Sequence, residues 1–273
     1  MKVRIIAGVV LLPLLLLLVL FAPKVCTAVL FGLMAAIGAY ELLRGTGLVK
    51  ELRLNIYSMV MALWACLWCG LRISYGWLLL VVLLFWVVLF AEMMLSGMKL
   101  PFQKVALCLV AGIVLPLLLG SLVRIHADNF GRFHIFIPFI LAFLSDTGAY
   151  FAGFFFGKHK LAPVISPKKT IEGMIGGVLG AMLGMVIYCL VMQFGYKLHA
   201  NYIYALIYGL LGSLAAVFGD LCFSVIKRQT GIKDYGNLIP GHGGILDRFD
   251  SMMLVGPLAE VMILLIPVVE VRW

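Results

Sequence analysis

An aspartate followed by two cations, late in the sequence, marks the first cluster of residues that could do chemistry. Asp220 is followed by Ser224, Lys227 and Arg228 at positions i+4, i+7 and i+8. At about 3.6 residues per turn, these side chains share one stripe of a helix. A carboxylate and two cations on one stripe suit a metal-bound phosphate, because the carboxylate can bind the metal and the cations can bind phosphate oxygens.

A polar segment after this stripe adds further cations and further aspartates. It contains Lys233, and it passes through a stretch whose glycines allow the backbone to approach a ligand closely, Pro240-Gly241-His242-Gly243-Gly244. Asp247 and Asp250 follow as i,i+3 neighbours on one helical face, with Arg248 between them. Because carboxylate and phosphate oxygens together hold Mg²⁺ in proteins, the cluster predicts metal-assisted phosphoryl or nucleotidyl transfer.

A second cluster lies earlier in the sequence. Asp146 stands near the middle of an apolar segment, where a carboxylate is costly and often functional. Farther on, Ser166 and Pro167 predict a helix that begins with Ser166 as its N-cap. Lys168 and Lys169 follow at once, and a helix start beside two lysines would bind an anion. The alternative is a basic loop that contacts anionic lipid headgroups.

The composition decides the class of protein in which these clusters work. Hydrophobic residues make up 64% of the 273 residues, charged residues make up 12%, and the mean hydropathy is +1.14. These values exclude a soluble enzyme, a disordered protein and a nucleic-acid-binding module, because no aqueous fold of this size could bury so much apolar surface. We therefore expect an all-α polytopic membrane protein. Its net charge of +9 then reflects loop cations that orient the helices and meet anionic lipid, with no nucleic acid partner.

Nine segments satisfy the requirement of about 20 mostly apolar residues for a spanning helix. They lie near 5–22, 25–43, 55–72, 77–95, 105–123, 134–156, 171–192, 202–226 and 250–269. The first five, within residues 1–130, carry almost no charge inside the membrane and are interpreted as a scaffold. The last four, within residues 131–273, carry both clusters and are interpreted as the catalytic part, with two basic loops at 157–170 and 227–249. In the seventh segment Gly176, Gly180 and Gly184 share one helix face, which predicts close packing against a second helix.

The residues of the two clusters resemble the sequence signature of the phosphatidate cytidylyltransferases, also called CDP-diacylglycerol synthases. The main stretch runs Ser224-Val225-Ile226-Lys227-Arg228, then Lys233-Asp234, then Ile239-Pro240-Gly241-His242-Gly243-Gly244-Ile245-Leu246-Asp247-Arg248-Phe249-Asp250. Two earlier stretches are similar to that family as well, Ser145-Asp146-Thr147-Gly148-Ala149-Tyr150 and Ser166-Pro167-Lys168-Lys169-Thr170. The resemblance covers residues 145–250, whereas the first 130 residues match only as apolar spans.

This resemblance implies an activity and a setting for it. CTP would react with phosphatidate, a membrane lipid, to give CDP-diacylglycerol and pyrophosphate, with Mg²⁺ as the required ion. An all-helical membrane fold and a homodimer are implied as well. The enzyme would lie in the inner (plasma) membrane with its active site facing the cytoplasm, where a soluble nucleotide can meet a lipid headgroup.

Roles for individual residues follow from the same resemblance. Asp220 and Asp247 would hold Mg²⁺, with Asp250 either as a third ligand or as a residue that supports the ligands. Asp146 is a candidate for a second cation or for orienting a lysine. The other expected catalytic residues bind phosphates and offset developing charge, and they are Lys227, Arg228 and Arg248. The other expected substrate-binding residues are Lys168, Lys169, Ser224, Lys233, His242, Gly243 and Gly244. No general base is assigned, because the phosphate of phosphatidate is already an anion near neutral pH.

Two other functions remain open from the sequence alone. A CTP-dependent polyprenol kinase would use similar carboxylates and cations, but it would release CDP instead of pyrophosphate. A secondary transporter would also place acids inside membrane spans. Transporters often contain internal repeats with paired broken helices, however, and no such symmetry is visible in this sequence.

The distribution of cations predicts the orientation of the chain. With nine spans, 15 of the 21 Lys and Arg residues fall on the side of the N-terminus, which indicates a cytoplasmic N-terminus and an external C-terminus. Reporter domains that are active on only one side of a membrane, fused to each end in turn, should therefore report opposite sides. Both ends on the same side would contradict the nine-span topology.

Overall fold

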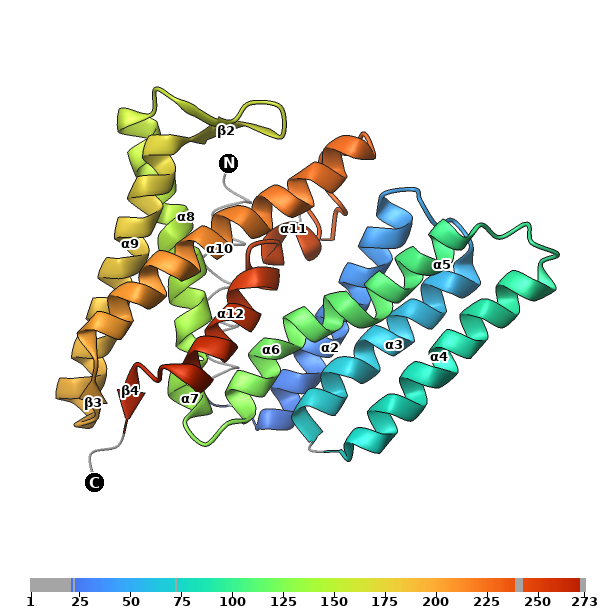
Figure 1. Ribbon diagram of the computed structural model, residues 1–273, viewed down its shortest axis with the longest axis horizontal. Coiled ribbons are helices and arrows are strands. Elements are labelled where there is room, and N and C mark those ends of the chain that lie inside the picture. The colour runs from blue at the N-terminus through green and yellow to red at the C-terminus, as the bar shows by residue number, and fades with distance from the viewer. Residues whose placement is uncertain (1–20, 22, 72, 239–242, 271–273) are drawn as a thin grey trace. The chain divides into compact units, whose positions relative to one another are not determined.

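Long apolar helices dominate the computed structural model (Figure 1), which describes residues 21, 23–71, 73–238 and 243–270. Among these residues, seven helices are long and apolar enough to cross a membrane. Their bounds are Lys24–Gly45, Leu52–Leu71, Tyr75–Leu95, Phe102–Ala127, Gly131–Phe156, Ile171–Gly195 and Tyr202–Gln229. They correspond to the second through eighth predicted spans, in agreement with a helical polytopic membrane protein. The first predicted span, 5–22, lies outside the described residues apart from residue 21, so the count of nine stays a prediction.

The helices group into two compact units that do not follow the order of the chain. The first unit combines the residues up to Arg132 with the later segment Lys227–Phe249. The second unit contains Phe133–Ile226 and the residues from Asp250 onward. The basic segment 227–249 thus folds with the N-terminal helices, whereas the sequence suggested a division at residue 130.

The first unit is built around three mutually packed helices, α2, α3 and α6, and α4 contacts α3 (Figure 1). Phe31, Leu119 and Leu122 are among its almost fully buried side chains. The elements of this unit are α2 (Lys24–Tyr40), η1 (Glu41–Gly45), α3 (Leu52–Leu71), α4 (Tyr75–Leu95), α5 (Phe102–Leu109), η2 (Val110–Val114), α6 (Leu115–Ala127) and α11 (Leu246–Phe249). Here η marks a π-helical segment.

The first unit contains two π-helical segments: η1 forms the end of the membrane helix Lys24–Gly45, whereas η2 interrupts the membrane helix Phe102–Ala127. The segment η2 ends two residues before Pro116, which lacks a backbone N–H and whose ring would clash with the carbonyl four residues earlier in an ordinary helix. The wider turn accommodates this proline in the first turn of α6. The segment η1 contains no proline and begins at a buried residue, Glu41. Such π turns often mark functional sites.

Two helices of the second unit, α8 (Phe136–Phe156) and α9 (Ile171–Leu190), lie side by side and pack through small residues (Figure 1). A Cβ atom at Gly180 would lie 2.7 Å from the carbonyl oxygen of Leu144. One at Gly176 would lie 2.8 Å from the carbonyl oxygen of Gly148. The predicted packing of the glycine face against a second helix is therefore confirmed. Further helical elements here include η3 (Val191–Gly195) and α10 (Tyr202–Gln229), whose last three residues belong to the first unit. The short α7 (Gly131–His134) also crosses the division, since its first two residues belong to the first unit.

The lysine-bearing stretch before α9 forms a strand, which corrects the predicted helix start at Ser166. β2 (Ser166–Thr170) pairs antiparallel with β1 (Lys160–Ala162), and this pairing keeps the stretch extended. The N-cap of α9 is Thr170, whose hydroxyl accepts a hydrogen bond of 3.1 Å from the N–H of Gly173. Threonine provides the same capping chemistry as serine, so the helix begins one strand later than predicted.

The last predicted span, 250–269, contains a shorter helix than expected. α12 (Met252–Leu265) has 14 residues, fewer than the roughly 20 that a membrane crossing needs. Pro267 explains its end, because the residue before a proline is driven out of the helical conformation, and Ile266 has φ −139° and ψ 67°. The chain then forms β4 (Val269–Glu270), which pairs antiparallel with β3 (His199–Ala200).

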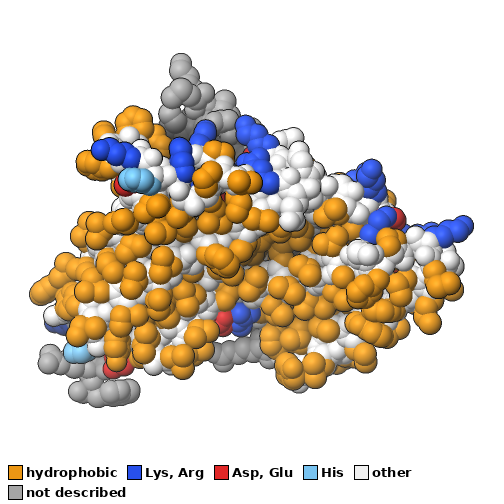
Figure 2. Space-filling model, turned by 45° about the horizontal axis from the view of Figure 1, so that its top comes forward, with side chains coloured by type: hydrophobic (Ala, Val, Ile, Leu, Met, Phe, Trp, Pro, Cys, Tyr) orange, Lys and Arg blue, Asp and Glu red, His pale blue; other side chains and the backbone are white. Residues whose placement is uncertain are grey.

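Apolar side chains cover most of the surface in view in Figure 2. The helix α4 is an extreme case, since Leu78, Phe85 and Leu89 are its buried residues and most of its other large apolar side chains are exposed. An apolar surface of this extent would drive association in water but is stable in lipid. The exposure pattern therefore agrees with helices that lie in a membrane.

The glycine face of α9 leads to a prediction about stability. Gly176→Ala should lower the free energy of unfolding by about 1–3 kcal/mol, because the added Cβ would overlap the side chain of Ala152 in α8. Gly195→Ala is the matched control, since nothing lies within 4 Å of a Cβ at that position, and it should change stability by less than about 0.5 kcal/mol. Thermal unfolding in detergent measures both variants, and equal melting temperatures would contradict this packing.

Candidate active site

A buried ion pair holds together the basic segment of the first unit. Lys227 Nζ lies 2.9 Å from Asp247 Oδ1, and the Asp247 side chain is 2% exposed. The other carboxylate oxygen, Oδ2, accepts hydrogen bonds from the backbone N–H groups of Tyr235 (2.8 Å) and Gly244 (3.0 Å). The Lys227 ammonium also lies 5.4 Å from the centre of the Tyr235 ring. Asp247 therefore ties the end of α10 to the loop that follows it.

A second buried carboxylate, absent from the predicted site residues, binds the same loop. Glu41 begins η1 and is 5% exposed. Its two oxygens accept hydrogen bonds from the N–H groups of Ile245 (3.0 Å) and Leu246 (2.8 Å). Together, Glu41 and Asp247 occupy the N–H groups of residues 244, 245 and 246 in succession. Residues 244 to 246, which begin at the last glycine of the glycine-rich stretch, thus donate their backbone N–H groups to internal carboxylates.

Two glycines, Gly243 and Gly244, leave room for those carboxylates. A Cβ at Gly244 would overlap the carboxylate of Glu41, and one at Gly243 would lie 2.8 Å from Asp247 Oδ2. Gly243 also has φ +85°, a conformation that glycine adopts without strain. The close approach expected of a ligand is therefore made here by side chains of the protein. His242, also predicted to bind substrate, lies outside the described residues.

The predicted phosphate-binding cations of this segment divide into exposed and buried side chains. Arg228, Lys233 and Arg248 are exposed, whereas Lys227 is buried against Asp247. Within the four residues of α11, Arg248 is the exposed one. Exposed arginine and lysine side chains can make charge-assisted hydrogen bonds to phosphate oxygens. The exposed cations are thus suited to a polyphosphate, while Lys227 serves the internal ion pair.

Within the second unit, Asp220 and Lys169 connect the two clusters that the sequence predicted separately. Lys169 Nζ of β2 lies 2.5 Å from Asp220 Oδ2 of α10, and the two side chains are 24% and 29% exposed. Ser224 Oγ donates a hydrogen bond of 3.1 Å to Asp220 Oδ1, as expected for neighbours on one helix stripe. A lysine predicted to bind an anion is therefore paired with an aspartate predicted to bind a metal.

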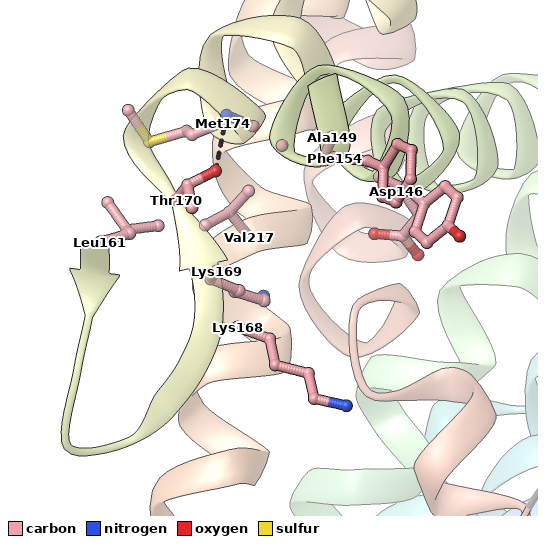
Figure 3. Close-up of a pocket in the computed structure, with 12 residues that line it drawn as sticks. Asp146, Ala149, Phe154, Leu161, Lys168, Lys169, Thr170, Met174 and Val217 are labelled. Atoms are coloured by element: carbon pink, nitrogen blue, oxygen red, sulfur yellow. Dashed lines mark hydrogen bonds between the residues drawn. The ribbon is translucent and has the colours of Figure 1, made fainter. Parts of the chain in front are cut away.

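A pocket of about 360 Å³ in the second unit is lined by residues of the hairpin, α8, α9 and α10. Its charged lining residues are Asp146, Lys168 and Lys169. Figure 3 shows both lysine side chains leaving β2 on the side where Asp146 of α8 lies. The large apolar or aromatic side chains of the lining are Tyr150, Phe154, Leu161, Met174 and Val217. This combination suits a ligand that has both an anionic group and an apolar part.

The three aspartates predicted to hold Mg²⁺ differ in how well they suit a hard cation. Asp220 is partly exposed, and its two oxygens contact the hydroxyl of Ser224 and the ammonium of Lys169. Asp250 belongs to the same unit, where a Cβ at Gly219 would lie 3.0 Å from the Asp250 carbonyl oxygen. Both oxygens of buried Asp247 already have protein donors. Within the described residues, no group of three His, Cys, Asp or Glu side chains is assembled to hold a metal ion.

Comparison with known proteins places this arrangement in a family. The sequence matches the cytidylyltransferase family over residues 2–266. The chain belongs to the cytidylyltransferase family. The stretches of sequence that resembled the phosphatidate cytidylyltransferases lie within the matched region, so the recognition from those motifs is confirmed.

Bacterial relatives within this cytidylyltransferase group carry the name phosphatidate cytidylyltransferase. A protein of Staphylococcus epidermidis is 42% identical over 170 residues, which cover 62% of this chain and 63% of the relative. A protein of Bacillus subtilis is 41% identical over 157 residues, 57% of each chain. One from Staphylococcus saprophyticus is 37% identical over 177 residues, 65% of this chain and 66% of the relative. The similarity thus spans less than two thirds of the length of each relative.

The stretches that resemble the phosphatidate cytidylyltransferases include Asp247 and the residues before it, but they do not include Glu41. Glu41 precedes its partner Ile245 by 204 positions. One sequence signal could have drawn attention to Glu41, because it stands near the end of an apolar helix, where the helix dipole disfavours a negative charge. A carboxylate there needs donors from elsewhere in the chain. Nothing local identifies those donors as Ile245 and Leu246.

The different burial of the two aspartates predicts different effects on stability. Asp247→Asn should lower the free energy of unfolding by about 3 kcal/mol or more, because Lys227 would stay buried without its carboxylate. Asp220→Asn makes the same chemical change in a partly exposed pair and should cost less than about 1 kcal/mol. Chemical unfolding in detergent measures both variants. Equal destabilisation would contradict the anchoring role of Asp247.

Proposed function

We propose that this member of the cytidylyltransferase family is a phosphatidate cytidylyltransferase. It transfers the cytidylyl group of CTP to phosphatidate and forms CDP-diacylglycerol and pyrophosphate, a step in phospholipid synthesis. The family match and the named relatives support the proposal. The observation that carries it is the pocket of the second unit, where two lysines stand beside apolar walls.

The lipid substrate is assigned to this pocket. Phosphatidate carries a phosphate monoester, which has a charge of about −1.5 to −2 near neutral pH, like a phosphorylated side chain. Lys168 and Lys169 bind that phosphate, and Tyr150 and Phe154 contact the glycerol and the beginning of the acyl chains. A volume of about 360 Å³ is near the lower limit for small-molecule sites, so the chains extend beyond the pocket along the helices.

The nucleotide is assigned to the basic segment of the first unit. Arg228, Lys233 and Arg248 are exposed there and can bind the triphosphate of CTP. The loop between them is held by Glu41 and Asp247. The chain thus offers a cationic surface for a soluble nucleotide and, separately, an amphipathic pocket for a lipid.

We assign Mg²⁺ to Asp220 and Asp250, which both belong to the second unit. The partly exposed carboxylate of Asp220 supports this choice, and the saturated hydrogen bonding of Asp247 favours an anchoring role for that residue. When bound, Mg²⁺ supplies positive charge beside phosphate oxygens. Lys169 then leaves Asp220 for the lipid phosphate. Asp146 stays the candidate for a second cation or for orienting Lys168.

The proposed reaction is a single displacement at phosphorus. An oxygen of the phosphatidate phosphate forms a bond to the α-phosphorus of CTP, and the bond from that phosphorus to the oxygen bridging the β-phosphate breaks. Pyrophosphate leaves with the electron pair. No general base is needed, because the attacking oxygen is already anionic near neutral pH. The exposed cations offset the negative charge that develops on the leaving group.

The proposal includes a place in the cell and an assembly. Bacterial relatives and the seven apolar helices support the plasma membrane. The excess of cations on the N-terminal side supports an active site that faces the cytoplasm. A homodimer is proposed from the family resemblance, and no nucleic acid partner is proposed, since loop cations in a membrane protein account for the charge of +9.

Product identification tests the function directly. Purified protein is incubated with phosphatidate, Mg²⁺ and CTP labelled at the α-phosphate. We expect labelled CDP-diacylglycerol and unlabelled pyrophosphate in equal amounts. Labelled CDP together with a newly phosphorylated lipid would identify a CTP-dependent lipid kinase instead. A folded protein that consumes no CTP would contradict the proposal.

The assignment of the lipid to the second unit predicts a selective change in KM. Lys168→Ala should raise the KM for phosphatidate about 10-fold or more while changing kcat little, because a lost charge-assisted hydrogen bond to a ground-state phosphate weakens uniform binding. Lys168 is preferred to Lys169, whose removal would also unpair Asp220. Lys160→Ala is the control, an exposed lysine of β1 outside the pocket lining. Steady-state kinetics in mixed micelles measures both variants, and an equal KM in the two would refute the assignment.

A further inference from the structure

Neither the apolar helix that carries Glu41 nor a lipid environment favours a carboxylate at this position. It is an acidic residue near the end of an apolar helix, and it is 5% exposed. A buried carboxylate persists when it receives hydrogen bonds, and the donors here are the N–H groups of Ile245 and Leu246. We propose that Glu41 is a positioning residue for cytidylyl transfer, which fixes the backbone at the start of α11, the short helix that carries Arg248. This inference rests on the proposed function.

The chain around Glu41 is shaped to admit its carboxylate. Cβ atoms at Gly236 and Gly244 would both overlap that group. A Cβ at Gly45, at the other end of η1, would overlap the carbonyl oxygen of Tyr235. Glycine at these three positions therefore lets η1 and the loop approach each other closely. A chance hydrogen bond to one carboxylate would not require glycine at three positions around it.

The conformation of η1 supports the same conclusion. The π-helical turn starts at Glu41, although no proline forces it. A wider turn changes the direction in which a side chain leaves the helix, and such turns are frequent at functional sites. The end of the segment is fixed as well, since the Thr46 hydroxyl donates a hydrogen bond of 2.5 Å to the carbonyl oxygen of Leu42. The backbone of η1, which carries Glu41, is thus fixed by a contact that does not involve the loop.

The contact has a direct consequence for the exposed cation of α11. This helix has four residues, too few to be stable alone, and its first N–H group, that of Leu246, is bound by Glu41. Leu246, Asp247 and Phe249 are buried while Arg248 is exposed. Fixing the first residue of such a short helix fixes where the Arg248 side chain begins. Without Glu41, Asp247 would remain as the loop's carboxylate anchor, bound to Gly244 and not to Leu246.

The test is Glu41→Gln in the full chain, reconstituted in lipid nanodiscs. Glutamine has the same size but one oxygen acceptor, and its NH₂ group would face a backbone N–H. We expect the amides of Ile245 and Leu246 to exchange hydrogen at least 10-fold faster. We expect kcat to fall about 10–100-fold with a raised KM for CTP and an unchanged KM for phosphatidate, because small misplacements of a binding group are costly.

Glu51→Gln is the matched control in the same unit. Glu51 pairs with Lys104, and its side chain is 42% exposed. The hydrogen bond from Lys104 lowers the pKa of Glu51, so this variant also removes a charge that is present at neutral pH. It should change neither loop exchange nor either KM. Where Glu41→Gln does not fold, Glu41→Asp carries the test, since it keeps the charge and shortens the reach, and its effects should have the same direction.

The outcomes separate this inference from the proposed function. Faster exchange at Ile245 and Leu246 in a protein whose wild type makes no CDP-diacylglycerol would support the anchoring and refute the cytidylyltransferase. Active wild type with unchanged exchange in the Glu41 variant would refute the inference alone. A lower kcat and a lower melting temperature, with no change in the KM for CTP or for phosphatidate, would show a purely structural role for Glu41. That result would also overturn the inference.

Discussion

A carboxylate that leaves water must find hydrogen-bond donors inside the protein, and this requirement organises the first unit. Glu41 and Asp247 meet it by accepting the N–H groups of three successive residues, 244 to 246. Lys227 completes the set as the counter-ion of Asp247. The segment 227–249 therefore folds with the N-terminal helices, although it continues from the part of α10 that belongs to the second unit. Apolar packing alone would not select the N-terminal helices as the partner of this segment.

The same requirement separates the charged residues into two kinds. Buried charges, such as Lys227 and Asp247, bind each other and hold backbone in place. Partly or fully exposed charges, such as Lys169 and Arg248, remain at surfaces where phosphate groups can reach them. In the proposed enzyme the buried charges position the backbone, and the exposed charges bind the substrates. Residue type alone does not distinguish buried from exposed charges, since the same stretch of sequence contains both.

Local patterns in the sequence predicted the local structure well. The seven long helices, the glycine face of α9 and the neighbourhood of Asp220 and Ser224 all follow from helical periodicity. The start of α9 was wrong because the capping residue was chosen without the strand pairing that extends residues 166–170. The short α12 follows from Pro267, a local signal that hydropathy does not weigh. Glu41 was missed because its partners are about 200 positions away, as the separation of 204 from Ile245 shows.

The central claim of this account is that the phosphate of a lipid is the nucleophile that attacks CTP. Phosphatidate whose phosphate oxygens carry ¹⁸O tests it most directly, with mass spectrometry of both products after turnover by the purified protein. The account predicts that all of the label stays in CDP-diacylglycerol, including the oxygen that bridges its two phosphorus atoms, and that pyrophosphate is unlabelled. Label in pyrophosphate, or an unlabelled bridging oxygen, would contradict it.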